Sequence, residues 1–518
     1  MYDAIVIGSG IGGLSAAKLL ARIAGKRVLV LEKHTEPGGQ THTFRRDGAS
    51  WDVGLHYIGQ VGPGSQLRAY FDYLSDGELA WNRLPDAYDR FVYPGIDFSA
   101  SSNPVEYQQK LIDTFPTEAR AIRRYFRDIR SANRWVTLGF AKNMVPRPIA
   151  PLLHGIQRIS GRTALGTTEH YLKKHFRSPE LRALLASQWG DYGLPPSRSA
   201  FAKHALIVDH YMNGGWFPEG GSARIARTFE KGIEQAGGAV RVAQDVQEIL
   251  VENGRAVGVR VLDRRGPVTQ ERIHRAPVVI SNAGAPVTFF NLLPTDGPVG
   301  AATAALRDAI RRIGTGISAV TVYLGLRDDP RSIGGTGGNV WVSRDLDHDD
   351  LPSQSDALLS GSPRNAFVSF SSVKSGETHH TAEIISFVDA DAFAAWRHTP
   401  KGNRGADYST LKQRIGSGLI DLAETAFPGL KDLVDYVEVA TPLTFEHYTS
   451  HPQGAFYGLP STPERYRFSF GPITPVKGLY LSGQDAGSCG VAGAMMGGVV
   501  AACQILGPKG FTEIRAAI

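Results

Sequence analysis

The chain has 518 residues, of which 42% are hydrophobic and 20% charged, and its formal net charge is +6. This composition is that of a globular protein with two to four domain-sized cores, and it excludes a disordered chain. We expect no segment to reach the roughly 18 apolar residues of a membrane-spanning helix. The chain is expected to begin directly with a strand, so we expect no signal sequence.

Cysteine content and charge indicate the cellular compartment and the possible binding partners. Two cysteines, Cys489 and Cys503, are too few for a disulfide framework, which is typical of a reducing, cytoplasmic protein. A pI of about 9.1 is compatible with nucleic acid or anionic lipid as a partner. We recognise no nucleic-acid-binding motif and no zinc-ligand spacing, and the adjacent His379 and His380 point to opposite sides of a strand. We therefore expect neither a nucleic acid nor a metal.

A dinucleotide-binding pattern opens the chain. Residues 4–7, "AIVI", read as a buried strand and are followed by "GSGIGG", which contains Gly8, Gly10, Gly12 and Gly13. In the G-x-G-x-x-G pattern the first glycine permits a tight turn, the second lets a pyrophosphate approach the backbone, and the third lets the helix pack on the strand. The start of the following helix offers free N–H groups to the phosphates.

A second strand, "RVLVLE", ends at Glu32. A carboxylate at this distance from the glycines is expected to accept hydrogen bonds from ribose hydroxyls. It favours an unphosphorylated ribose, hence FAD or NAD rather than NADP.

The last segment, "GLYLSGQDAGSCGVAGAMMGGVVAACQIL", supports a flavin. It predicts a strand at 478–482, a turn with Gly483 and Asp485, and a helix that begins near Val491 and Ala492. The positive end of that helix would stabilise an anionic reduced flavin. Asp485 is predicted to hold a ribityl hydroxyl or, through water, a phosphate. The alternative is a simple helix N-cap.

The continuation "EKHTEPGGQTHTF" resembles flavoproteins of the amine oxidase and phytoene desaturase superfamily. In that superfamily the double glycine passes the flavin side of the pyrophosphate. The resemblance implies that Lys33, Gly38, Gly39, Gln40 and Thr41 contact the cofactor.

Five pieces make the resemblance more specific: "GGQTHTF", "DVGLHYIG", "WFPEGGSARIA", "TPLTFEHYTSHPQGAFYG" and "GLYLSGQDAGSCGVAGAM". They resemble the all-trans-retinol 13,14-reductase-like members of the carotenoid isomerase and phytoene desaturase family of FAD-dependent oxidoreductases. The resemblance runs from residue 4 to about 506 and is weakest in 100–205 and 330–410. It implies FAD, a long apolar conjugated substrate and chemistry at carbon–carbon double bonds.

In this family the segment after the double glycine runs beside the flavin, so the resemblance places His56 and Tyr57 on the floor of the substrate pocket. Reduction of a double bond needs a hydride and a proton, and a histidine titrating near neutrality or a tyrosine can supply the proton. The alternative is that the pair only shapes the cavity. Glu219 and the pair 447–448 are further candidates for the pocket, with Glu219 as an alternative proton source.

The expected fold is α/β, with a Rossmann-like FAD-binding domain interleaved with an α+β substrate-binding domain. The FAD-binding domain is expected to comprise 1–75, 210–285 and 470–518, and the substrate-binding domain 76–209 and 286–469.

Within the middle FAD-binding piece the sequence predicts a hairpin that turns at 252–254. The resemblance lays the backbone of Val246 against adenine and turns Asn282 and Ala283 toward the dinucleotide. "GGTGGNV" at 334–340 does not follow a strand, which predicts a loop rather than a second nucleotide site. We therefore expect an external electron carrier or NAD(P)H as the redox partner.

Residues 120–160 are a candidate membrane-contact segment. Residues 120–134 are basic, with Ile122, Tyr125, Phe126 and Ile129 at helical spacing, and 136–160 contain no acidic residue. The two interpretations are peripheral attachment to the inner face of a membrane, or a solvated helix face followed by a proline-broken core segment.

The function that the sequence favours is therefore a saturase of a retinoid-like or carotenoid-like polyene. The alternatives are a desaturase, a redox-neutral cis–trans isomerase, or a non-catalytic flavoprotein that carries a lipid.

Overall fold

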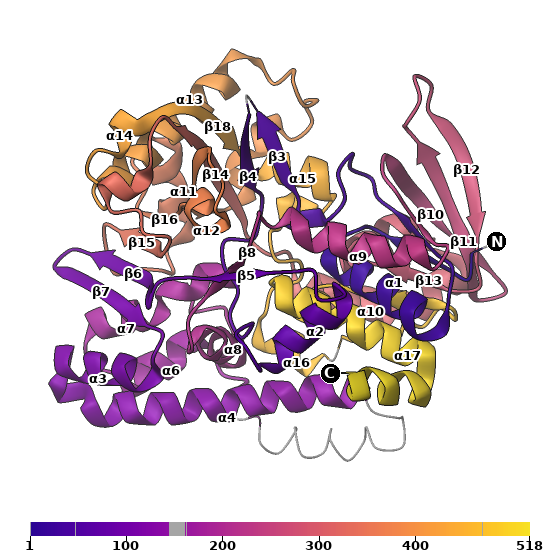
Figure 1. The fold of residues 1–518 in the computed structure, drawn as a ribbon, viewed down its shortest axis with the longest axis horizontal. Coiled ribbons are helices and arrows are strands. Elements are labelled where there is room, and N and C mark those ends of the chain that lie inside the picture. The colour runs from indigo at the N-terminus through magenta and orange to yellow at the C-terminus, as the bar shows by residue number, and fades with distance from the viewer. Residues whose placement is uncertain (1, 47, 145–160, 162, 469, 518) are drawn as a thin grey trace.

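In a computed structural model of the protein, residues 2–46, 48–144, 161, 163–468 and 470–517 are described (Figure 1). A five-stranded parallel sheet has the order β19-β13-β1-β2-β9. Its strands are β1 (Ala4–Ile7), β2 (Val28–Leu31), β9 (Ala239–Arg241), β13 (Val279–Ser281) and β19 (Leu479–Leu481). β1 lies at the centre and is fully buried, as a strand covered on both faces must be. The predicted α/β class is confirmed.

Helices cover one face of this sheet, at the right of Figure 1. Here α1 (Ile11–Ala24) packs against α9 (Ala223–Gln235) and α17 (Val491–Ala517). Val6 points into this layer, whereas the neighbouring Ile5 packs on the opposite face against an antiparallel sheet. The alternation of a strand's side chains thus fills two separate cores.

The antiparallel sheet contains β10 (Gln244–Glu252), β11 (Arg255–Asp263) and β12 (Gln270–Arg275). The β10–β11 connection has Asn253 and Gly254 at φ 49° and 74°. Two residues with positive φ form the tight turn that joins twisted strands, so the predicted hairpin is confirmed.

A mixed seven-stranded sheet has the order β18-β14-β17-β16-β15-β6-β7, in which β15 and β6 are the parallel pair. Its strands are β6 (Ala87–Tyr93), β7 (Ile96–Ser101), β14 (Ser318–Leu326), β15 (Asn339–Ser343), β16 (Asn365–Ser369), β17 (His380–Val388) and β18 (Val434–Ala440). The helix α13 (Gly405–Glu424) packs on one face. The other face carries aromatic side chains and turns toward the interior of the molecule.

A helical layer lies below this sheet in Figure 1. It comprises α3 (Pro104–Thr114), α4 (Ala119–Met144), α6 (Thr168–His175), α7 (Pro179–Ala186) and α8 (Phe201–Tyr211). In α4, the predicted apolar positions at 122, 125, 126 and 129 are buried, and α8 packs on this helix. The predicted helical spacing is therefore confirmed. The prediction for 136–160 falls largely on residues outside those described.

The remaining elements connect these layers. They include β3 (Thr43–Arg46), β4 (Ala49–Asp52), β5 (Trp81–Arg83), β8 (Trp216–Pro218), α2 (Gln66–Leu74), α10 (Gly297–Ile313), α11 (Leu351–Leu359), α12 (Ser371–Ser375), α14 (Leu430–Leu433), α15 (Pro442–Thr449) and α16 (Pro463–Arg467). The parallel sheet draws on 4–31, 239–281 and 479–481, and the seven-stranded sheet on 87–101 and 318–440. The chain thus passes between the two sheets several times.

The expectation that no segment is long and apolar enough to span a membrane is wrong. Within α17, the stretch Val491–Pro508 has 18 residues with a mean hydropathy of 1.5, which is long and apolar enough to cross a membrane by these criteria alone. Its side chains at Met495, Val499 and Cys503 are buried in the core that α1 shares. Packing against α1 accounts for the apolar character of this helix.

Candidate functional site: a dinucleotide cavity and a buried acid cluster

A cavity of about 720 Å³ lies where β1, β2, α1 and α17 meet. Its volume falls within the roughly 300–1,000 Å³ of small-molecule sites. The predicted cofactor residues that line it are Gly8, Gly10, Gly12, Glu32, Lys33, Gly38, Gly39, Gln40, Thr41, Val246, Asn282, Ala283, Gly483 and Val491. Segments far apart in the sequence thus converge on one cavity.

The glycine turn shapes the centre of this cavity. Gly8 has φ +90°, and a Cβ on Gly39 would lie 2.8 Å from the Cα of Gly10, so two backbones meet without side chains between them. The N-cap of α1 is Gly10, and no side chain caps this helix. Its first N–H groups are therefore free to bind an anion, and the cradle fits the pyrophosphate of a dinucleotide.

Three of the predicted residues, Gly13, Ala492 and Asp485, do not line the cavity. A Cβ on Gly13 would lie 2.3 Å from the carbonyl oxygen of Gly8, so this glycine lets α1 pack on the turn, as the motif requires. Ala492 lies in the first turn of α17, and its neighbours Val491 and Ala494 line the cavity instead.

Glu32 lies at the end of β2 with only 8% of its surface exposed. Its carboxylate accepts hydrogen bonds from the Ser9 N–H at 2.8 Å, the Ser9 hydroxyl at 2.6 Å and the His34 N–H at 2.8 Å. The glycine loop therefore fixes the carboxylate in the cavity wall, where it can accept further hydrogen bonds from a ribose.

Lys33 and the pair 447–448 lie at the same end. The Lys33 ammonium donates to the His447 carbonyl at 2.9 Å and to the Ser450 hydroxyl at 2.6 Å. Tyr448 lines the cavity, with its ring 4.9 Å from that of His34, whereas His447 does not. The position of Tyr448 beside His34 and Lys33 assigns it to the ribose end of the cavity.

Asp485 has a different environment from the one predicted. It is 1% exposed and does not line the cavity. Its carboxylate accepts hydrogen bonds from the N–H groups of Ala285 at 2.7 Å and Leu459 at 2.9 Å. The residue therefore ties together the loops that carry the cavity wall, and Gln484 faces the cavity in its place.

His56 is buried and lies behind the cavity wall rather than on it. Within the described part of the chain, neither ring nitrogen has a hydrogen-bond partner, and Nδ1 is 3.9 Å from the Glu383 carboxyl. Burial, together with the charge of Lys374, lowers the pKa of His56 to about 3. The ring is neutral at physiological pH, so the prediction of a histidine that titrates near neutrality is wrong.

Lys374 and Glu383 are functional candidates that the sequence did not reveal. The Lys374 ammonium donates to the His56 carbonyl at 2.9 Å, to the Ser369 hydroxyl at 2.8 Å and to the amide oxygen of Asn339. Burial lowers the pKa of Lys374 to about 8 and raises that of Glu383 to about 8. Such shifts in a group of buried side chains are typical of functional sites.

Tyr57 lies between two carboxylates. Its hydroxyl oxygen is 2.6 Å from Asp191 Oδ2 and 3.0 Å from Asp89 Oδ2, and its ring stacks on Tyr211 at 4.0 Å between centroids. Burial raises the pKa of Asp89 to about 6, and burial with the neighbouring Asp89 raises that of Asp191 well above its ordinary range. One feature of the sequence could have indicated Asp89. It is an acidic residue two positions before Phe91 in a strand, on the same buried face.

Glu219 does not belong to this group. It is exposed, it follows β8, and its N–H donates to the Ala80 carbonyl. Because its carboxylate faces solvent, the predicted role in the pocket is wrong.

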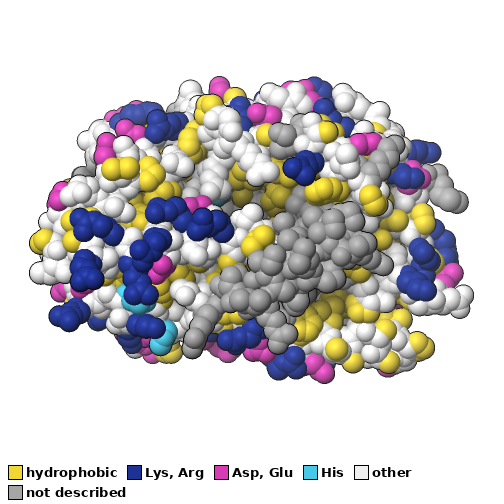
Figure 2. Space-filling view, turned by 90° about the horizontal axis from the view of Figure 1, so that it is seen from below, with side chains coloured by type: hydrophobic (Ala, Val, Ile, Leu, Met, Phe, Trp, Pro, Cys, Tyr) yellow, Lys and Arg dark blue, Asp and Glu magenta, His cyan; other side chains and the backbone are white. Residues whose placement is uncertain are grey.

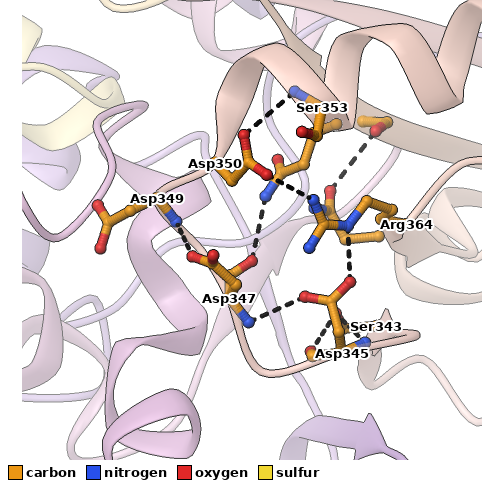
Figure 3. A network of polar contacts seen from close by, with 10 residues as sticks. Ser343, Asp345, Asp347, Asp349, Asp350, Ser353 and Arg364 are labelled. Carbon is orange, nitrogen blue, oxygen red and sulfur yellow. Dashed lines mark hydrogen bonds and ion pairs between the residues drawn. The ribbon is translucent and has the colours of Figure 1, made fainter.

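An acidic loop after β15 is held by Arg364 (Figure 3). The guanidinium of Arg364 contacts Asp345 at 2.7 Å and Asp350 at 3.2 Å, and the N–H of Asp347 donates to Asp345. Among the described residues, no group of His, Cys, Asp and Glu side chains is arranged to hold a metal ion. The aspartates of this loop are used instead to fix the backbone around His348.

Comparison with known proteins identifies the family. The family model of flavin containing amine oxidoreductases matches residues 11–506. The chain belongs to this family. It is 33% identical to an all-trans-retinol 13,14-reductase of Danio rerio, over 97% of this chain and 86% of that protein. It is 25% identical to a chloroplastic prolycopene isomerase of Daucus carota, over 99% and 81%.

A solved structure supports the fold. Wild-type putrescine oxidase bound to putrescine matches with a TM-score of 0.64 and 16% identity, over 98% of this chain and 99% of that chain. The protein is thus an FAD-dependent oxidoreductase, and the predicted cofactor is confirmed. The free N–H groups of α1 and the carboxylate of Glu32 are the groups that would hold the pyrophosphate and the adenosine ribose.

Proposed function

We propose that this protein is a saturase that reduces a carbon–carbon double bond in a long, apolar, conjugated polyene. The observation that carries the proposal is the 33% identity, over nearly the whole chain, to an enzyme named as a reductase of all-trans-retinol. The similarity covers the N-terminal and C-terminal segments that line the FAD cavity. One relative therefore supports both the cofactor chemistry and the substrate class that we propose.

The surroundings of Tyr57 support an apolar conjugated substrate. Aromatic side chains gather on the inner face of the seven-stranded sheet, where Trp341 lies 4.6 Å from Phe367 between ring centroids. Phe387 lies 5.1 Å from Trp189 of the helical layer. Aromatic rings pack favourably on flat apolar chains and do not require hydrogen-bonding groups on them.

The chemistry divides between cofactor and protein. Reduced FAD, when bound, supplies a hydride to one carbon of the double bond. The chain must bind the polyene, exclude water and deliver a proton to the other carbon. The neutral ring of His56 suits a packing role in this scheme, whereas the Tyr57 hydroxyl lies beside two carboxyl groups.

The electrons have to come from outside the chain. The segment 334–340 follows the short helix Pro330–Ile333 and runs into β15, so no strand directly precedes it to present a phosphate loop. We assign the role of electron donor to an external carrier or to NAD(P)H that binds transiently.

Product mass tests the proposal. Purified protein with FAD kept reduced by dithionite is incubated with all-trans-retinol, and the products are analysed by mass spectrometry. A saturase yields a product heavier by two hydrogen atoms. A product of unchanged mass but altered double-bond geometry would instead support an isomerase, which the similarity to prolycopene isomerase favours as the second candidate. Binding without conversion would support a lipid carrier and contradict both.

Peripheral attachment to a membrane surface accompanies this function, because the substrate class resides in lipid. Figure 2 looks at the face that α4 forms, and Lys and Arg side chains gather on its left half. The exposed basic residues of α4 are Arg120, Arg123, Arg124, Arg127, Arg130 and Arg134. Basic side chains near an anionic surface each contribute about 1 kcal/mol to binding.

A further inference from the structure

The hydroxyl of Tyr57 lies within hydrogen-bond distance of two carboxylates, and its single hydrogen can satisfy only one of them. Its oxygen is 2.6 Å from Asp191 and 3.0 Å from Asp89. If both carboxylates were ionised, one of these contacts would set an oxygen lone pair against a negative charge. The arrangement is satisfied when one carboxyl is protonated and donates to the Tyr57 oxygen. Geometry thus places two hydrogens on this group of three residues.

The other partners of the two carboxyls decide which one is protonated. Asp89 accepts hydrogen bonds from the amides of Gln188 at 2.8 Å and Asn339 at 3.2 Å, which stabilise its charge. Within the described part of the chain, Tyr57 is the hydrogen-bond partner of the Asp191 carboxyl. Asp89 is therefore the ionised member and Asp191 the acid. The pKa of Asp191, raised well above its ordinary range by burial and by Asp89, agrees with this assignment.

Asp191 is also the more exposed member of the pair. It is partly exposed, whereas Asp89 is fully buried. Two residues along the chain, a Cβ on Gly193 would lie 2.3 Å from the ring of Tyr457, and Tyr457 lines the FAD cavity. The segment that carries Asp191 therefore packs against a side chain of the FAD-cavity wall.

A second set of contacts fixes this segment. The indole N–H of Trp189 donates to His348 Nδ1 at 3.0 Å, and the other ring nitrogen of His348 lies 3.0 Å from the Ala183 carbonyl. The loop around His348 is the one that Arg364 holds (Figure 3). The backbone that carries Asp191 is thus held from two directions, which is what a positioned acid requires.

We propose that Asp191 is the acid that protonates the substrate carbon, and that Tyr57 and Asp89 are the positioning residues that hold this proton ready. The inference rests on the proposed reduction. The π bond breaks as hydride from reduced FAD forms one C–H bond and the Asp191 proton forms the other. In this balance the alkene would gain the two electrons that reduced FAD supplies as hydride, and Asp191 would be left as a carboxylate that regains a proton from water.

Two lysines set the charge of the group after this transfer. Lys203, fully buried in α8, contributes a positive charge that favours an ionised Asp191, and Lys374 does the same for Asp89. Among the described residues, the other titratable groups that interact with the two carboxyls are phenols, and these stay protonated because burial raises their pKa values. They belong to Tyr88, Tyr107, Tyr192, Tyr211 and Tyr457. Two negative charges can therefore coexist transiently, and the next proton restores the resting state.

The first test does not depend on activity. Infrared difference spectra of the FAD-loaded protein in H₂O and D₂O detect protonated carboxyl groups at neutral pH. We expect Asp191→Asn to lose a protonated-carboxyl band that the exposed control Asp308→Asn retains. Glu383→Gln identifies the band of the second protonated carboxyl. A spectrum of Asp191→Asn identical to that of the unmodified protein would overturn the assignment.

The second test separates proton delivery from the other steps. With FAD reduced beforehand and all-trans-retinol added, we expect Asp191→Asn to slow flavin reoxidation by roughly 10²–10⁴-fold, the usual contribution of a positioned acid. Reduction by dithionite and the visible spectrum of bound FAD should stay unchanged, which shows that the variant folds, and Asp191→Glu should recover part of the rate. A loss below about tenfold in Asp191→Asn would overturn the inference.

The two tests also distinguish this inference from the proposed function. If the unmodified protein yields no product heavier by two hydrogen atoms, the saturase proposal fails while the infrared band still reports the proton on Asp191. If the product forms and Asp191→Asn makes it at the normal rate, the saturase stands and the role of Asp191 fails.

Discussion

Glu32 shows at the scale of one residue how the protein prepares for its cofactor. Ser9 and His34 already hold the carboxylate, so a ribose meets an acceptor whose orientation is set. We expect Glu32→Ala to weaken FAD binding by roughly 1–3 kcal/mol, the cost of leaving buried polar groups without partners. Titration of the apoprotein with FAD, followed by quenching of flavin fluorescence, measures this change.

The exposed Glu234→Ala on α9 is the matched control, because it removes the same carboxylate outside the cavity. Equal affinities for Glu32→Ala and Glu234→Ala would remove Glu32 from the binding site.

His56 makes a prediction about pH. Its folded-state pKa of about 3 lies below the ordinary value of 6.5, so between these pH values the unfolded chain binds a proton that the buried ring does not. The contribution of His56 to stability is therefore present above pH 6.5 and lost as pH falls toward 3. We expect His56→Asn to reduce the acid-side loss by up to about 1.4 kcal/mol per pH unit in this window.

Urea unfolding followed by tryptophan fluorescence, at several pH values between neutrality and the onset of acid denaturation, checks this. His204 and His210 also have pKa values lowered to about 3 by burial, so a slope remains in the variant. Parallel stability curves for the variant and the unmodified protein would show that His56 takes up its proton in the folded state.

Sequence patterns predicted residues whose role is local and missed those whose role depends on tertiary contact. Gly8, Gly10 and Glu32 act within one β-α-β unit, so their spacing carries the information. Asp191 sits in "QWGDYG" with no pattern around it, and only the approach of Tyr57, from a segment more than a hundred residues away in the chain, gives it a function.

The helix α4 is the element whose surface carries a prediction. The sequence predicted the buried side of this helix, because apolar residues that recur every 3.6 positions indicate a helix face wherever the helix lies. The sequence did not predict on which side of the molecule the basic face of α4 lies. We expect Arg123→Gln, Arg127→Gln and Arg130→Gln together to reduce co-flotation with vesicles of anionic phospholipid. The expected loss is about 1 kcal/mol per residue near the surface.

The matched control replaces Arg255, Arg272 and Arg275 by Gln. These residues are exposed on the β11–β12 hairpin, away from α4 in Figure 1. An equal loss of flotation in both triple variants would mean that net charge, and not the face of α4, drives association. Flotation that salt does not weaken would contradict an electrostatic contribution.

At the scale of the whole molecule, we expect bound FAD to raise the free energy of unfolding. Residues of the cavity wall come from the N-terminal unit, from 244–246, from 282–284 and from 482–494. A ligand that binds only the folded chain at about a thousand times its Kd stabilises it by about 4 kcal/mol. Differential scanning calorimetry with and without added FAD should show a higher transition temperature for the loaded protein. Identical transitions would contradict a cavity assembled from these separate segments.

The architecture was predictable where strand and helix patterns are local, and less so where strands meet across the chain. The parallel sheet follows from buried strands joined to helices, but the pairing of β15 with β6 joins segments about 250 residues apart with no signal in either. The sequence therefore did not predict the inner face of that sheet. Nor did it predict the aromatic side chains on this face or the contact of Tyr57 with Asp89 and Asp191.

The order in which the sheets draw on the chain has a consequence for biosynthesis. β1 emerges from the ribosome well before its neighbour β13, which begins at Val279, and β19 with α17 completes the cavity later still. At roughly 5–20 residues per second, the first strand waits on the order of tens of seconds for that neighbour. During this interval one of its edges has no partner strand, which invites association with other nascent chains. We therefore expect FAD to be bound only after the segment 482–494 of the cavity wall has been synthesised.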